Sequence, residues 1–273
     1  MGTLFLVATP IGNLEDITLR ALRTLGEAGC IAAEDTRQTR KLLERYQIRV
    51  PLISYHEHNK FTRLKDVLTR LEDGDVALVS DAGTPGLSDP GYELVRAALE
   101  AGHGVQAIPG ASAPIAALVS SGLPTDAFVF LGYLPRRAAD RRTVLQTLAD
   151  ERRTVLAFEV PHRLQDALAD MQAVLGSERR LAVARELTKL HEEIFRGTVA
   201  EAATRFETQP ARGEITLVIG GAAEAHPWDE AQVRLALADQ RSLGMPPSEA
   251  ARRVAEASGW PRRRVYRLAL ERE

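Results

Sequence analysis

The chain has 273 residues, of which 45% are hydrophobic and 26% are charged, and its net charge at pH 7 is −2. This composition excludes a disordered chain and is typical of a globular protein, while the length favours two domains, or one domain with an appendage. The near-neutral charge excludes a generally basic nucleic-acid-coating protein, so a polyanionic partner requires local basic patches.

Residues 1–121 alternate apolar runs with amphipathic stretches, which is the pattern of strands alternating with helices. We expect strands at residues 3–8, 30–33, 52–54, 76–80 and 105–108. We expect helices at residues 18–27, 36–46, 60–72, 92–101 and 112–120. This order predicts an α/β domain over residues 1–121, with a mostly parallel sheet between helical layers.

A linker-like segment, residues 121–126, separates this domain from a second round of elements, because its glycine and proline discourage a helix or strand from running through. We expect strands at residues 128–131, 154–158, 181–185, 193–196 and 215–219. We expect helices at residues 137–150, 162–175 and 199–206. These elements predict a second α/β domain over residues 122–222.

The remaining segment, residues 228–273, has only helical patterns. A capped helix, a turn containing Gly259 and a second helix that begins with arginines predict a helix-turn-helix. This small helical extension either binds a nucleic acid, as helix-turn-helix units do, or forms a structural cap of three helices.

Three polar, glycine-bearing loops follow predicted strands, at residues 9–13, 80–85 and 109–112. The carboxyl ends of parallel strands share one edge of a sheet, so the loops are expected to meet around one ligand. Backbone N–H groups at Gly83, Gly110 and the helix beginning at Ser112 suit a carboxylate, and Asp81 suits an ammonium group. These features predict a site for an amino acid or its derivative, although each loop alone is compatible with a tight turn.

Several motifs lack a part that their chemistry needs. Gly102 and Gly104 fit a dinucleotide fingerprint but follow a helix and precede a strand, the wrong order for phosphate binding. Ser112 lies where a nucleophile elbow places its serine, but Pro114 replaces the final glycine, so an N-cap is the simpler interpretation. His56 and His58 lack a third placed ligand, and we expect no metal.

Nine segments together resemble a known family. They are TPIGN (9–13), AAEDTR (32–37), SDAGTP (80–85), DPGYELV (89–95), PGASA (109–113), GYLPRR (132–137), PHR (161–163), ARELTK (184–189) and GEITLVI (213–219). In this order they resemble the bacterial small-subunit ribosomal RNA cytidine 2′-O-methyltransferases, a branch of the tetrapyrrole methylase superfamily.

The resemblance implies a two-domain class III methyltransferase that binds S-adenosylmethionine in a cleft between its domains and methylates a cytidine ribose in ribosomal RNA. It further implies a homodimer, acting on naked RNA or on the assembled 30S subunit. The residues implied to bind the cofactor are Pro10, Asp81, Gly83, Thr84, Ser112, Ala113, Glu159, Val160, Glu214 and Ile215. The family usually has serine where this chain has Val160, so a hydroxyl contact there is not expected.

Methyl transfer to a ribose requires alignment of the hydroxyl and removal of one proton. Asp35 of AAEDTR, and Glu186 or Lys189 of ARELTK, are the candidates for this catalytic role. Each is also compatible with a structural ion pair, for example Asp35 with Arg37.

Clustered arginines are the candidates for RNA contact, because guanidinium groups bind phosphates. The candidates lie at the starts of two predicted helices and in the PHR motif. They are Arg37, Arg40, Arg136, Arg137, Arg141 and Arg163. Arg137 and Arg141 have the i, i+4 spacing that places both on one helix face. A solvated charged face remains the alternative for each cluster.

Two other functions remain open. One is a tetrapyrrole C-methyltransferase, which the low aromatic content of 5% disfavours because a porphyrinoid needs a broad apolar platform. The other is a DNA-binding regulator whose body senses S-adenosylmethionine. The single cysteine and the absence of a signal peptide or a run of ~18 apolar residues lead us to expect a cytoplasmic protein without membrane attachment.

Overall fold

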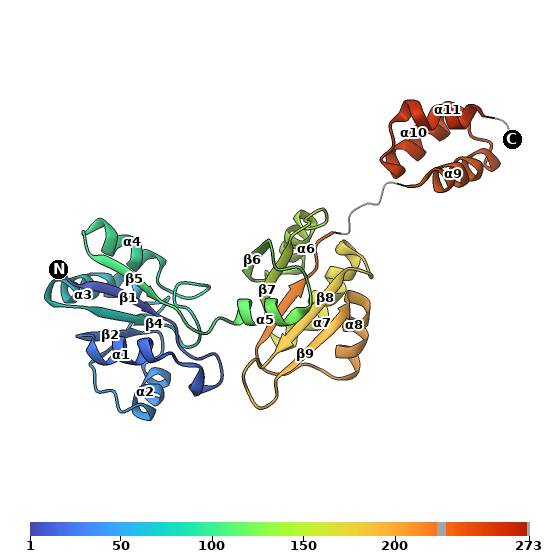
Figure 1. Cartoon of the computed structure of the whole chain (residues 1–273). Helices are drawn as coiled ribbons and strands as arrows, with labels where there is room; N and C mark the ends of the chain where they lie inside the picture. Colours follow the sequence, from blue (N-terminus) through green and yellow to red (C-terminus); the bar gives the residue numbers. More distant parts are fainter. Residues whose placement is uncertain (223–227, 272–273) are drawn as a thin grey trace. The chain divides into compact units, whose positions relative to one another are not determined.

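The computed structural model describes residues 1–222 and 228–271 of the chain. The chain divides into two compact units, Met1–Ala222 and Ala223–Glu273. The first unit contains two five-stranded sheets with their helices, and the second contains three helices (Figure 1).

The first sheet has the order β3-β2-β4-β1-β5, and every neighbouring pair is parallel. Its strands are β1 (Thr3–Val7), β2 (Cys30–Ala33), β3 (Leu52–Ser54), β4 (Val76–Val79) and β5 (Gly104–Ile108). The connections contain η1 (Leu14–Asp16), α1 (Leu19–Glu27), α2 (Thr36–Arg45), α3 (Lys60–Asp73) and α4 (Tyr92–Glu100). The predicted parallel α/β arrangement is therefore confirmed.

Helices cover both faces of this sheet, with α1 and α2 on one side and α3 and α4 on the other (Figure 1). Along β2, Ile31 packs in the core under α1 and α2, whereas Ala32 packs in the core under α3 and α4. All residues of β2 and β4 are buried. Burial on both faces explains why these strands are uninterrupted apolar runs.

The second sheet has the order β6-β7-β10-β8-β9, in which β6 and β7 are parallel and the other neighbouring pairs are antiparallel. Its strands are β6 (Phe128–Tyr133), β7 (Thr154–Glu159), β8 (Arg180–Arg185), β9 (Glu193–Thr198) and β10 (Ile215–Ile219). Helices α6 (Ala138–Thr147), α7 (Pro161–Leu175) and α8 (Val199–Thr208) supply the core on one face.

The other face of the second sheet is covered by α5 (Ala113–Ser121). Ala117 and Leu118 of α5 pack with Leu156 and Val218 of that sheet. The expected domain boundary after residue 121 therefore does not follow the packing, because α5 lies with the second sheet. Its sequence shows that it is apolar but not which sheet buries it.

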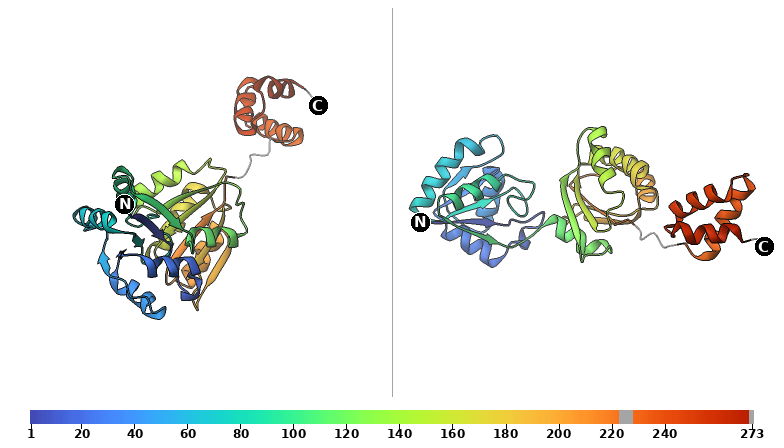
Figure 2. Two further views of the ribbon diagram at one scale, coloured as in Figure 1. Left: turned by 60° about the vertical axis from the view of Figure 1, so that its left-hand side comes forward. Right: turned by 90° about the horizontal axis from the view of Figure 1, so that it is seen from above.

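The second unit consists of α9 (Glu230–Ser242), α10 (Pro247–Ser258) and α11 (Arg262–Leu270), which pack side by side in both views of Figure 2. Gly259, at φ +69°, ends α10 in the left-handed conformation that glycine adopts readily. The predicted helix-turn-helix is confirmed within residues 228–271, and the last two residues of the predicted segment lie outside the described residues. None of the helices in the described ranges has the length and apolarity needed to cross a membrane.

Candidate cofactor site

The three glycine-bearing loops meet at the carboxyl ends of the adjacent strands β4, β1 and β5. Thr9 and Gly83 form an isolated antiparallel bridge, with N–H···O distances of 2.9 and 3.0 Å. Gly83 has φ +80°, and a Cβ there would lie 3.3 Å from Ile11 Cγ2, so this close approach favours glycine. The predicted convergence of the loops is confirmed.

A cavity of about 420 Å³ lies beside these loops, and residues from both sheets line it. Nine of the ten predicted cofactor residues line this cavity: Asp81, Gly83, Thr84, Ser112, Ala113, Glu159, Val160, Glu214 and Ile215. Pro10 is buried and does not line it, whereas the next residue, Ile11, does. The sequence motifs therefore predicted residues that gather around one cavity, and the cofactor contacts of all ten stay a prediction.

The cavity is strongly acidic. Its lining includes five carboxylates, those of Glu34, Asp81, Asp89, Glu159 and Glu214. Among the described residues that line it, there is no lysine, arginine or histidine. This set of charges favours a cationic ligand and repels a phosphate.

Glu159, at the end of β7, has an unsatisfied oxygen in the cavity wall. The residue is only 1% exposed, and Oε1 forms an ion pair with Arg163 Nη2 at 2.5 Å and accepts the Val160 N–H at 2.8 Å. Oε2 is buried without a hydrogen-bond partner among the described residues. Because an unpaired buried acceptor is costly, this oxygen suits an N–H or O–H donor on a ligand.

Asp89 and Glu34 lie in the same wall and were not predicted as site residues. Burial, reinforced by the charge of Glu34, raises the pKa of Asp89 to about 6. Burial also raises the pKa of Glu34, although the backbone N–H of Asp81 donates to its carboxylate. The DPGYELV segment contains Asp89, but its sequence gives no sign that Glu34, far away in the chain, would face it.

The start of α5 contributes an anion-binding element to the cavity. Ser112 is the N-cap, as predicted, but its side chain makes no capping hydrogen bond. Ser112, Ala113 and Pro114 all line the cavity. The free N–H groups of a first helical turn attract a carboxylate or another anion.

None of the predicted catalytic residues lines the cavity. The Asp35 side chain accepts the N–H of Arg37 at the start of α2 and pairs with the Arg37 guanidinium at 3.0 and 2.7 Å. The hydrogen bonds from the Arg37 side chain and backbone lower the pKa of Asp35 to about 2, far from that of a general base at neutral pH. Asp35 is therefore placed as an ion-paired helix cap.

Glu186 and Lys189 form a supporting network behind the cavity wall. Lys189 Nζ contacts Glu186 Oε1 at 2.9 Å and Glu214 Oε2 at 3.1 Å, and Glu186 Oε1 accepts the Glu214 N–H at 3.0 Å. The hydrogen bond from Lys189 lowers the pKa of Glu186, despite partial burial. These contacts position Glu214, the only one of the three that lines the cavity.

The predicted RNA-binding arginines have different environments. Arg40, Arg136 and Arg137 are exposed, and Arg37 is exposed but paired with Asp35. Arg141 is only 3% exposed, and its Nη2 lies 2.6 Å from Asp170 Oδ2. The prediction that Arg141 contacts RNA is corrected, because its guanidinium is buried in an ion pair between α6 and α7.

The remaining candidate, Arg163, is held by Glu159 and lines a second cavity together with Arg136. That cavity shares Tyr133 and Val160 with the acidic one. The sequence thus predicted two basic residues of this cavity but not Tyr133, which lines it with them.

A family model described as Tetrapyrrole (Corrin/Porphyrin) Methylases matches residues 3–203, and one described as RsmI C-terminal HTH domain matches residues 226–273. The chain is 52% identical over 276 residues to a Ribosomal RNA small subunit methyltransferase I of Synechocystis sp., covering 100% of this chain and 99% of the relative. It is 47% identical over 273 residues to the protein of the same name in Halalkalibacterium halodurans, covering 98% and 94%.

Solved structures share the fold at lower sequence identity. The methyltransferase CobJ matches with a TM-score of 0.61 and 19% identity, over 82% of this chain and 95% of that chain. Uroporphyrin-III C-methyl transferase from Thermus thermophilus, complexed with S-adenyl homocysteine, matches with a TM-score of 0.57 and 18% identity, over 81% and 97%. At these identities the likeness is one of fold.

Proposed function

The chain belongs to the tetrapyrrole methylase family, and on that premise we propose that it methylates the 2′-oxygen of a cytidine in small-subunit ribosomal RNA, using S-adenosylmethionine. The observation that carries the proposal is the acidic cavity lined by residues of both sheets. S-adenosylmethionine bears a sulfonium and an ammonium cation, and its single carboxylate leaves it with a net positive charge. Five carboxylates without a basic lining residue suit such a ligand.

Each polar part of the cofactor has a complementary group in the cavity. Asp81 suits the ammonium group, and the uncapped N-terminus of α5 suits the carboxylate. Glu159 Oε2, which has no hydrogen-bond partner in the part of the chain that the structure describes, suits an N–H or O–H donor of the nucleoside part. The cavity volume of about 420 Å³ lies within the range of about 300–1,000 Å³ that is typical of small-molecule sites.

When bound, the cofactor supplies a methyl group that is already activated on a sulfonium sulfur. The chain then has to align the ribose hydroxyl, which contributes on the order of 7–11 kcal/mol, and remove its proton, which contributes about 10²–10⁴-fold. We assign the second task to Asp89, because it lines the cavity and its pKa of about 6 lies close to neutral pH. Asp89 would accept the proton of the ribose hydroxyl, and the bound cofactor would supply the methyl group that replaces it.

The RNA substrate is supported by the names of the relatives that match the chain over nearly its full length. The experiment is to incubate small subunits from a strain lacking this methylation with radiolabelled S-adenosylmethionine, and to map the label. We expect it on the 2′-oxygen of one cytidine, with Asp81→Ala as the inactive control. Label on a base, or none on RNA, would refute the proposal, and naked 16S RNA run in parallel tests whether assembly is required.

The regulator hypothesis makes a different prediction for the helical extension. A DNA-binding regulator would shift duplex DNA in a gel and leave small subunits unlabelled. An RNA methyltransferase is expected to bind small subunits and to show only weak, salt-sensitive binding to duplex DNA.

We also propose that the protein acts as a cytoplasmic homodimer, the state implied by its family. The buried thiol of Cys30 fits a reducing compartment. Light scattering of the purified chain tests the dimer, because the mass of one chain is 29.9 kDa.

A further inference from the structure

A second cavity, of about 550 Å³, adjoins the acidic one and carries the opposite charge. Its lining is Tyr133, Leu134, Arg136, Val160, His162 and Arg163. Among these described lining residues there is no carboxylate, whereas the neighbouring cavity has five. Two adjacent cavities of opposite charge suit two ligands of opposite charge, a cation in one and a polyanion in the other.

The basic side chains differ in how firmly they are held. Arg163 is anchored, because Nη2 pairs with Glu159 at 2.5 Å, Nη1 donates to the Leu134 carbonyl at 3.5 Å, and only 14% of the side chain is exposed. Arg136 is exposed, with no ion pair among the described residues. Both come from segments at the cavity mouth, where α7 starts at Pro161 without an acidic residue in its first turn. Because Glu159 balances the charge of Arg163, the exposed guanidinium of Arg136 and the start of α7 supply the positive field of this cavity.

Tyr133 stands at the boundary of the two cavities because of a β-bulge. Phe130 pairs with Leu156, but Tyr133 pairs with Phe158, so β6 advances three residues while β7 advances two. Gly132 has φ +67°, the left-handed conformation that allows the irregularity. Bulges of this kind change the direction in which a side chain points near a functional site.

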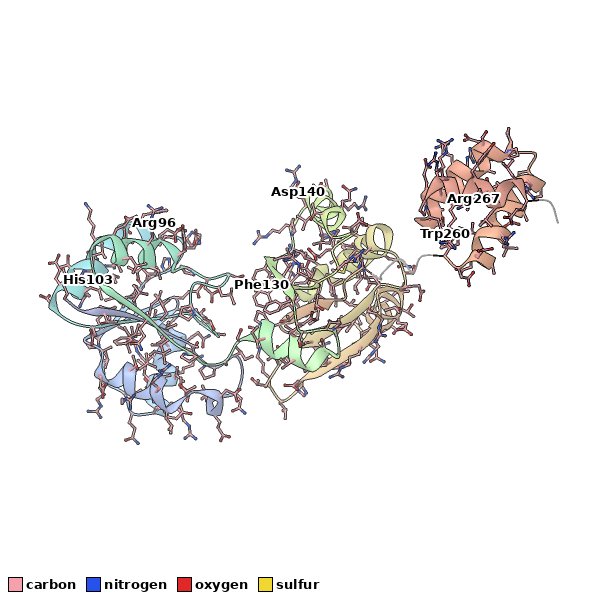
Figure 3. All side chains as sticks on the ribbon, turned by 45° about the horizontal axis from the view of Figure 1, so that its top comes forward. Arg96, His103, Phe130, Asp140, Trp260 and Arg267 are labelled. Atoms are coloured by element: carbon pink, nitrogen blue, oxygen red, sulfur yellow. The ribbon has the colours of Figure 1, made fainter. Side chains whose placement is uncertain are left out.

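The resulting tyrosine ring is both supported and accessible. It lies 5.3 Å from the ring of Phe158, and Phe158 in turn lies 5.2 Å from Phe130, which is labelled in Figure 3. Tyr133 nevertheless is 56% exposed. An exposed aromatic ring with a rigid backing is the platform on which unstacked RNA bases stack.

We propose that the second cavity binds the single-stranded RNA segment that carries the target nucleotide. The base stacks on Tyr133 and a neighbouring phosphate contacts Arg136, while Arg163, held by Glu159 and the Leu134 carbonyl, forms the fixed wall beside them. The shared wall formed by Tyr133 and Val160 then leaves the ribose facing the acidic cavity, while the five carboxylates keep phosphates out of the cofactor's place. This inference rests on the proposed function, which names RNA as the polyanion.

The test uses the full chain and four variants: Tyr133→Ala, Tyr133→Phe, Arg136→Gln and Arg96→Gln. The last is a matched control, since Arg96 lies on α4, pairs with Glu100 and lines neither cavity (Figure 3). Affinity for unmethylated small subunits is measured by filter binding over a series of salt concentrations. Affinity for S-adenosylmethionine is measured by calorimetry, which also shows that each variant is folded.

We expect Tyr133→Ala to weaken subunit binding by about 5- to 150-fold, the loss typical of one stacked base, and Tyr133→Phe to restore it. Arg136→Gln is expected to lower the slope of log affinity against log salt by about 0.7, the value for one phosphate of a single strand. Cofactor affinity is expected to stay at the wild-type value in Arg136→Gln, because Arg136 lines only the second cavity, and Arg96→Gln is expected to match the wild type throughout. Tyr133 lines both cavities, so its two variants are judged by their subunit affinity.

Wild-type subunit affinity in both Tyr133→Ala and Arg136→Gln would overturn the inference, as would a loss of cofactor affinity alone. If the variants behave as expected but the wild type leaves the ribose unlabelled, the proposed methylation is refuted, whereas RNA binding by the second cavity is supported. If the wild type labels the cytidine and the variants bind subunits normally, only the cavity inference fails.

Discussion

The backbone N–H of Asp35 donates a hydrogen bond to Asp81 Oδ1 over 2.9 Å. This contact joins the turn after β2 to the loop after β4 and fixes the orientation of the Asp81 carboxylate. The side chain of Asp35 takes no part in it, because it is bound to Arg37. Two neighbouring aspartates at one sheet edge therefore have separate tasks, helix capping for Asp35 and the ligand binding that we propose for Asp81.

Replacing Asp81 with alanine is expected to abolish measurable binding of S-adenosylmethionine in calorimetry, because the carboxylate proposed to meet the ammonium group is lost. The melting temperature is expected to change little, since Asp81 is exposed. Asp81→Asn keeps an acceptor for the Asp35 N–H but loses the charge, so its affinity is expected to be intermediate. Unchanged affinity in the alanine variant would remove Asp81 from the cofactor site.

Replacing Asp35 with alanine is expected to leave cofactor affinity near the wild-type value, because the backbone N–H that contacts Asp81 remains. The variant is expected to lose about 1 kcal/mol of stability with the N-cap of α2, which lowers the melting temperature by about 2–4 °C. Asp35→Ser keeps a capping oxygen and serves as the control. A fall in kcat of about 10²-fold or more in both variants, at normal stability, would instead identify Asp35 as the base.

Asp89 is expected to control the pH dependence of activity. A base with a pKa of about 6 must be deprotonated to accept the ribose proton, so kcat is expected to rise through pH 6 and then level off. Asp89→Asn is expected to lose about 10²–10⁴-fold in kcat together with this rise. A variant that keeps the rise in kcat near pH 6 would show that another group accepts the proton.

The same residue gives a prediction for stability. Because burial raises the pKa of Asp89 from 3.8 to about 6, the stability gained from its neutral form is present below pH 3.8 and is lost as the pH rises through 6. Asp89→Asn is permanently neutral and is expected to exceed the wild type at pH 8 by roughly 1 kcal/mol, allowing for solvent screening of a partly exposed group. Melting curves at pH 4 and pH 8 measure the difference, which is expected only at pH 8.

Arg141 and Arg142 form a matched pair, since both contact Asp170, at 2.6 and 2.5 Å. The Arg141 side chain is 4% exposed and that of Arg142 is 59% exposed. Arg141→Met is expected to destabilise the fold by about 3–5 kcal/mol, because it strips a buried carboxylate of its buried partner. Arg142→Met is expected to cost about 1 kcal/mol or less in urea unfolding, and equal costs would contradict this assignment.

The sequence by itself determined the order of the helices and strands and the place of the cofactor loops. Apolar periodicity can be recognised within a short window of sequence. For this reason β2, β3 and β10 begin and end at the predicted residues. The loops after β1, β4 and β5 converge because parallel strands place their carboxyl ends at one edge. Both conclusions need only local patterns and one rule of sheet geometry.

Only the tertiary structure decided which polar groups are buried and what they face. Arg141 and Arg142 are adjacent in sequence and both contact Asp170 of α7, yet only Arg141 is buried between the two helices. Asp89 has a raised pKa because the fold buries it near Glu34, 55 positions earlier in the chain. The burial of a polar side chain and its partners depend on contacts between segments that are distant in the sequence. These contacts cannot be predicted from a short window of sequence.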